Sequence, residues 1–248
     1  MSGHSKWHNI KLRKGKADAQ RGALFTKLSK EIILAAKSGS PDPEANYRLK
    51  MAVEKARENN MPQDNIKRAI GHAGGAAGEK EIHEIRYEGY GPHGVAVVVD
   101  AATDNRNRTA GELRFLFGKH GGTLGETGSV AWMFDPVGII VADPQGRPED
   151  AFTEAALVDG VVDLDYGDPA EIFTDPAQLA EARDALQKTG MKVSDVHLGV
   201  RAKQKTALRE RELAGALTFL EALEEHEDVQ RVFSNLEVSD AALEALVT

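Results

Sequence analysis

Residues 1–32 read MSGHSKWHNIKLRKGKADAQRGALFTKLSKEI and hold the densest positive charge in this chain of 248 residues. Between positions 1 and 30, eight Lys or Arg stand against a single acid, Asp18, so this segment carries a net charge of +7. The whole chain has 31 basic and 39 acidic residues, a net charge of −8. The sequence therefore joins a basic start to an acidic body, and such a start is typical of a surface that meets phosphate.

The candidate nucleic-acid contacts are the basic residues of this stretch together with its one tryptophan. Lysine and arginine attract phosphate, and an indole can stack on a base. The candidates are Lys6, Trp7, Lys11, Arg13, Lys14, Lys16, Arg21, Lys27 and Lys30. The alternative is a solvated, disordered basic terminus. Trp7 favours the first interpretation, because an uncovered indole lowers solubility and a base or a groove would cover it.

The basic stretch runs into a segment with a helical pattern, residues 16–37. Its expected packing face consists of Leu24, Leu28, Ile32 and Ala35, and its expected basic face of Lys16, Lys27, Lys30 and Lys37. A second helix is expected over residues 42–60, with Asp42 as its N-cap and Pro43 at its first position. A third begins at Met61 and Pro62. Three helices with short joints predict a small helical bundle.

Charge is also segregated along the whole chain. Residues 1–72 contain 15 Lys or Arg and 7 Asp or Glu, a net charge of +8, whereas residues 73–248 contain 16 and 32, a net charge of −16. A long polyanion would repel the acidic part. We therefore expect any contact with nucleic acid to be local and end-on rather than lengthwise.

Beyond a glycine-rich linker at residues 71–80, the pattern changes from helical to strand spacing. Strands are expected at 84–90, 94–101, 129–134 and 137–142, with a helix at 109–119; an acidic unit with helices and strands covers 144–200; a helix at 206–226 and a strand at 228–238 close the chain. The last helix and strand complete the first of these units, so the sequence predicts an α+β fold with antiparallel sheets and one domain inserted into another. The expected domains are 1–75, a basic helical domain; 80–136 with 205–240, an α+β domain; and 137–204, an inserted acidic α+β domain.

Several kinds of chemistry find no support in the sequence. The chain contains no cysteine, which excludes disulfides, iron–sulfur clusters and thiol catalysis. His4 and His8 have metal-ligand spacing but no evident third ligand, and Gly89–Gly94 matches a dinucleotide fingerprint but precedes a strand instead of a helix. We assign no catalytic residue, metal or cofactor and expect a protein that is not an enzyme. The basic terminus lacks the apolar core of a signal peptide, so we expect a cytoplasmic location.

The segment TDNRNRT, residues 103–109, is a secondary candidate for anion binding. Arg106 and Arg108 stand near the expected start of a helix, where the helix dipole favours negative charge. Two explanations remain open. Either Asp104 offsets the two arginines, or an external anion such as phosphate does.

The motifs GHSKWxNI, FTKL, NMPxDNI, YEGYGPxG, TDNRNRT and GGxLGxxGSV resemble those of the YebC family, and the likeness runs nearly from end to end. This resemblance implies a helical domain followed by two α+β domains, the last inserted in the middle one. It also implies a regulator: the family is customarily described as transcriptional, while a mitochondrial relative activates translation and other members look like ribosome-associated factors. Gln20 and Ala23 stand where the resemblance leads us to expect basic residues.

These observations predict an RNA- or ribosome-binding factor that regulates translation, with rRNA or tRNA as its partner. The alternative is a duplex-DNA-binding transcriptional regulator that binds promoter DNA. An enzyme acting on phosphorylated small molecules through Arg106 and a protein-interaction scaffold are further hypotheses. Ribosomal or other proteins are expected partners of the acidic domains, a membrane is not, and the sequence leaves the oligomeric state open.

Overall fold

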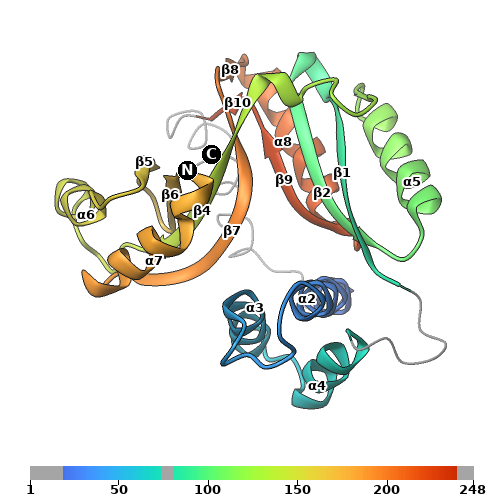
Figure 1. Ribbon diagram of the computed structural model, residues 1–248. Helices are drawn as coiled ribbons and strands as arrows, with labels where there is room; N and C mark the ends of the chain where they lie inside the picture. Colours follow the sequence, from blue (N-terminus) through green and yellow to red (C-terminus); the bar gives the residue numbers. More distant parts are fainter. Residues whose placement is uncertain (1–18, 74–80, 239–248) are drawn as a thin grey trace. The chain divides into compact units, whose positions relative to one another are not determined.

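The computed structural model describes residues 19–73 and 81–238 and shows an α+β protein (Figure 1). It divides into two compact units. One contains the described residues up to Ala131 together with 215–232, and the other contains 132–214 with 233–238. The predicted fold class is confirmed: a helical bundle is followed by α+β domains with antiparallel sheets, one inserted into the other. The domain boundaries drawn from the sequence stay predictions.

Three helices form the bundle, namely α2 (Ala19–Lys37), α3 (Tyr47–Glu58) and α4 (Gln63–His72). Their shared core is built from residues that recur at helical spacing, including Leu28, Ile32, Leu49, Val53, Ile66 and Ala69. The predicted start of the second helix at Asp42 is wrong. Asn46 is the N-cap of α3: its Oδ1 accepts the N–H of Leu49 at 3.1 Å, and its Nδ2 donates to the carbonyl oxygens of Ala35 and Ser40. One side chain thus ties the end of α2 to the start of α3.

The first sheet has the strand order β3-β1-β2-β9. Its strands are β1 (His83–Tyr90), β2 (Ala96–Thr103), β3 (Thr123–Leu124) and β9 (Val229–Ser234), and its helices are α5 (Arg106–Lys119) and α8 (Glu210–Glu224). β1 and β2 pair antiparallel through a 3-10 helix at Pro92–Gly94. The Gly89–Gly94 motif therefore ends β1 and forms the turn to β2, so the predicted turn between two strands lies at residues 91–94. The edge of the Phe117 ring meets Phe219 at 4.9 Å between centroids and closes the core between α5 and α8.

The second sheet is antiparallel throughout, in the order β5-β6-β4-β7. Its strands are β4 (Phe134–Asp143), β5 (Val161–Asp165), β6 (Ala170–Thr174) and β7 (Lys192–Ala202). The helices α6 (Glu149–Ala156) and α7 (Leu179–Lys188), preceded by a 3-10 helix at Pro176–Gln178, pack their buried Phe152 and Leu186 against Ile140 and Ile172. Two short strands, β8 (Thr206–Ala207) and β10 (Leu236–Glu237), form a separate parallel pair.

One predicted strand and one predicted helix start are wrong, in both cases because of a hydrogen bond with a residue distant in the sequence. Of the strand expected at 129–134, residues 129–133 do not form one, because the Glu88 carboxylate accepts the backbone N–H groups of Val130 and Ala131 at 2.9 and 2.8 Å. A 3-10 helix at Ala131–Met133 leads into β4 instead, which begins at Phe134. The helix expected from Thr206 begins at Glu210, since the Thr206 N–H donates to the Asn235 carbonyl oxygen at 2.7 Å. Within residues 19–73 and 81–238, no helix has the length and apolar content needed to span a bilayer.

Candidate nucleic-acid interface

The predicted contact residues divide into two groups. Lys6, Trp7, Lys11, Arg13, Lys14 and Lys16 lie outside the described residues, as do His4 and His8. Arg21, Lys27 and Lys30 lie on α2. The Arg21 side chain is exposed, near the start of that helix.

Lys27 and Lys30 are engaged inside the protein, at the carboxyl end of α8 and just beyond it. Lys27 Nζ donates to the carbonyl oxygen of Glu224, while Lys30 Nζ donates to the carbonyl oxygen of Glu227 at 3.1 Å and to the carboxylate of Asp228. Burial lowers the pKa of Lys27 to about 8, against the opposing effect of the Glu224 carboxylate. Of the basic face expected on α2, Lys30 is only 8% exposed and Lys27 is half-buried, so both amines are turned toward groups of the protein itself.

Asp228, in the turn between α8 and β9, is the centre of this internal network. Its side chain is completely buried and accepts hydrogen bonds from Lys30 Nζ, from Thr109 Oγ1 at 2.6 Å and from Arg108 Nη2 at 2.8 Å. Burial alone would raise the pKa of Asp228, but these donors outweigh it and lower the pKa to about 2. One carboxylate thus joins α2, α5 and the turn before β9.

The two arginines of the secondary anion candidate, Arg106 and Arg108, have different surroundings in the structure. Arg108 pairs with Asp228, with Asp104 at 3.2 Å and with Glu112 at 3.8 Å, and the hydrogen bond with Asp228 raises the pKa of its guanidinium. Its charge is offset inside the protein, by Asp104 among others. Arg106 remains exposed; its carbonyl oxygen accepts the hydroxyl of Tyr87 at 3.2 Å. The helix carrying both begins three residues earlier than predicted, because Asn105 caps it through the Arg108 N–H.

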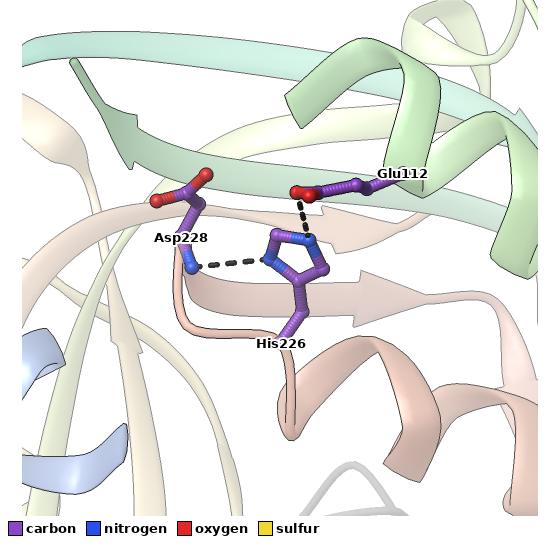
Figure 2. Close-up of side chains that lie close together, drawn as sticks. All are labelled: Glu112, His226 and Asp228. Atoms are coloured by element: carbon purple, nitrogen blue, oxygen red, sulfur yellow. Dashed lines mark hydrogen bonds and ion pairs between the residues drawn. The ribbon is translucent and has the colours of Figure 1, made fainter. Parts of the chain in front are cut away.

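Glu112, His226 and Asp228 lie close enough together to suggest a metal site, with candidate ligand atoms within 4.8 Å of one another (Figure 2). The hydrogen bonds of these residues do not fit metal binding. His226 Nδ1 accepts the backbone N–H of Asp228 at 3.1 Å, so Nε2 carries the proton and donates to Glu112 at 3.0 Å. Neither ring nitrogen then offers a lone pair, and the cations of Lys30 and Arg108 next to Asp228 repel a metal. The arrangement fits an internal hydrogen-bond network.

The helical bundle also contains a groove that the sequence does not predict. It lies between α2 and α4 and is lined by Phe25, Thr26, Ser29, Ile33, Asn65, Arg68, Ala69 and His72. The spacing of Asn65, Arg68 and His72, three and then four residues apart, places these polar groups on one face of a helix. That spacing is the signal that could have found them, but only the packing of α4 beside α2 shows that the face borders a groove.

Comparison with known proteins identifies the family of this chain. Residues 5–76 match the family described as "TACO1/YebC protein N-terminal domain", and residues 82–236 match "TACO1/YebC second and third domain". The chain belongs to the TACO1/YebC family. The resemblance seen in the sequence motifs is thereby confirmed.

Relatives of this TACO1/YebC chain cover nearly its full length. A probable transcriptional regulatory protein of Thermoanaerobacter pseudethanolicus is 46% identical over 242 residues, which cover 97% of this chain and 98% of the relative. A protein of the same name from Lactobacillus helveticus is 51% identical over 239 residues, 94% of this chain and 98% of the relative. A crystal structure of a conserved hypothetical protein from Aquifex aeolicus is 40% identical, has a TM-score of 0.83 and covers 91% of this chain and 93% of its own. The relatives' names describe regulators, and a regulatory role is the part of the functional prediction that these TACO1/YebC comparisons support.

Proposed function

We propose that this protein is a non-enzymatic nucleic-acid-binding regulator that acts on RNA or on the ribosome and regulates translation. One observation carries the proposal: residues 1–72 have a net charge of +8, and the rest of the chain has −16. A site that neutralises phosphate needs such a local excess of Lys and Arg. The acidic remainder is repelled from phosphate and stays outside the contact, where it can meet proteins.

The proposed contact uses the basic stretch and the exposed start of α2. Its members are Lys6, Trp7, Lys11, Arg13, Lys14, Lys16 and Arg21. Lys27 and Lys30 serve a different purpose in this proposal, because their amines hold α2 against Glu224, Glu227 and Asp228. Arg106, exposed at the start of α5, is a secondary phosphate contact, whereas Arg108 is neutralised within the protein.

A duplex-DNA-binding transcriptional regulator is the second candidate, and the names of the relatives favour it. A reader of the major groove presents a set of base-contacting side chains on one exposed helix. On α2 the face with Lys27 and Lys30 is packed, so it cannot enter a groove in this way. Promoter binding that loses about 1–3 kcal/mol for each mismatched base pair would place this candidate first.

Binding measurements on the full chain test the proposal. The ligands are purified ribosomes, a structured RNA and a promoter duplex, at several salt concentrations around physiological ionic strength. Replacing Lys11, Arg13 and Lys14 with alanine should lower the slope of log K against log salt by about 0.7–0.9 for each phosphate that the variant no longer neutralises. Absence of any affinity for ribosomes and RNA would refute the proposal.

A matched variant controls for net charge. It replaces three exposed basic residues of the acidic part of the chain, Lys188, Arg209 and Arg211, with alanine. The two triple variants lose the same charge, so a general electrostatic effect would weaken both equally. The proposal expects the salt slope to change only in the variant of the basic stretch.

A further inference from the structure

The groove between α2 and α4 has a volume of about 290 Å³ and is lined by apolar and polar residues. Ile33 and Ala69, 6% and 5% exposed, form an apolar floor. Phe25 is partly exposed and packs against the bundle core. The walls are polar and none of the lining residues is acidic: they are Thr26, Ser29, Asn65, Arg68 and His72.

Positive charge borders this groove on both helices. Arg68 is exposed on α4 and, among the described residues, forms no ion pair within 4.0 Å, unlike Arg108, which has three carboxylate partners. Lys67 is exposed beside it. Arg21, exposed on α2, lies one turn before Phe25 and therefore on the same side of the helix. One acidic residue, Asp64, is also exposed one turn before Arg68, but it does not line the groove, so the cations outnumber the carboxylates around it.

We propose that this groove binds one nucleotide of single-stranded RNA, with its base against Phe25 and its phosphate at Arg68. The inference rests on the proposed function and extends it by placing a contact within the described residues. Aromatic rings are the usual stacking partners of unpaired bases, and guanidinium groups bind phosphate oxygens in pairs. The volume is near the lower end of small-molecule pockets, about 300–1,000 Å³, which suits a single nucleotide.

The groove favours an unpaired strand over a duplex. Bases in a duplex are stacked on one another, so only an unpaired nucleotide can turn the face of its base toward Phe25. The Ser29 hydroxyl and the Asn65 amide then line the groove, where they can hydrogen-bond with a base edge or a ribose hydroxyl, whereas the Thr26 hydroxyl donates to the Gly22 carbonyl oxygen at 3.1 Å and is left as an acceptor. The ribose hydroxyl is the group that distinguishes RNA from DNA at such a site.

Fluorescence anisotropy with the full chain tests the inference. The probes are a short labelled single-stranded RNA of mixed sequence, the single-stranded DNA of the same sequence and the DNA duplex. Phe25→Leu keeps an apolar side chain against the bundle core but removes the ring, and we expect RNA affinity to fall at least about 5-fold. Arg68→Ala should lower the slope of log K against log salt by about 0.7, the share of one phosphate contact on a single strand.

Arg57→Ala is the matched control, because Arg57 is exposed on α3, carries the same charge and does not line the groove. It should leave the salt slope unchanged. Circular dichroism melting of each variant establishes that Phe25→Leu and Arg68→Ala remain folded under the binding conditions.

The outcomes separate the two proposals. If the unmodified chain binds RNA and both groove variants bind it equally well, the groove assignment is overturned while the proposed function stands. Equal or tighter binding of the duplex would also overturn it. If the unmodified chain binds neither RNA nor ribosomes, the proposed function itself fails. A loss confined to Phe25→Leu and Arg68→Ala, with single-stranded RNA the tightest ligand, supports the groove.

Discussion

Replacing Asp228 with asparagine should destabilise the fold by about 2–3 kcal/mol at neutral pH. The pKa of Asp228 is about 2 against an ordinary value of 3.8, and one pKa unit corresponds to about 1.4 kcal/mol, so ionisation contributes about 2 kcal/mol. Removing one partner from a buried ion pair costs about 3–5 kcal/mol. Asparagine keeps an oxygen for Thr109 or Arg108, so we expect a loss between the roughly 2 kcal/mol of ionisation and the lower end of this range.

The loss should depend on pH in a defined direction. Because folding lowers the pKa of Asp228, its contribution is complete above about pH 4 and disappears as the pH falls through 2. The difference in unfolding free energy between the unmodified chain and Asp228→Asn should therefore be constant at neutral pH. It should shrink between about pH 4, where the carboxyl group of the unfolded chain takes up its proton, and pH 2, where the native carboxyl group does so.

Urea unfolding followed by circular dichroism measures this difference. Asp159→Asn is the control, because Asp159 is exposed and, in the part of the chain that the structure describes, has no ion-pair partner. The control should unfold like the unmodified chain at every pH. A stability of Asp228→Asn equal to that of the control, or a difference that stays constant down to pH 2, would refute the role given to the buried carboxylate.

Four further substitutions test other parts of the fold. Glu88→Gln should lower the unfolding free energy measured in urea by about 1–3 kcal/mol. The new amide nitrogen is a donor and would face a backbone N–H group whose hydrogen bond the carboxylate now accepts, so unchanged stability would contradict this. Relative to Lys27→Met, the unmodified chain should gain stability as the pH rises from about 8 to 10.5, since burial lowers the pKa of Lys27 and the unfolded chain then binds more protons; a difference independent of pH would count against it. Gly111→Ala should stabilise α5 by about 0.5–1 kcal/mol, because the added Cβ meets no atom within 4 Å. Gly122→Ala should instead lower the Tm, since its Cβ would lie 2.5 Å from the carbonyl oxygen of Tyr90. Thermal melting of both alanine variants measures the two opposite effects.

Local pattern was a good guide to the elements of this fold. The spacing of Leu28 and Ile32 predicts α2, and the apolar run of Val95 to Val99 predicts β2, because both patterns record which side of an element meets the core. Errors occur where a distant group takes over a backbone N–H. Glu88 lies about 40 residues before the segment it captures at Val130, and no periodicity along the chain can reveal such a bond.

The sequence by itself determined the α+β fold class, the family and the concentration of positive charge in residues 1–72. Only the tertiary structure decided what individual charges do. In the sequence, Lys27, Lys30 and Arg21 are equivalent basic residues of one segment. In the structure, Lys27 and Lys30 are held by groups almost 200 residues away, whereas Arg21 is exposed. Periodicity is a property of neighbouring residues, whereas the state of a charge depends on burial and on partners that folding brings near it. For the same reason the polar face of Asn65, Arg68 and His72 became part of a groove only when α4 packed beside α2.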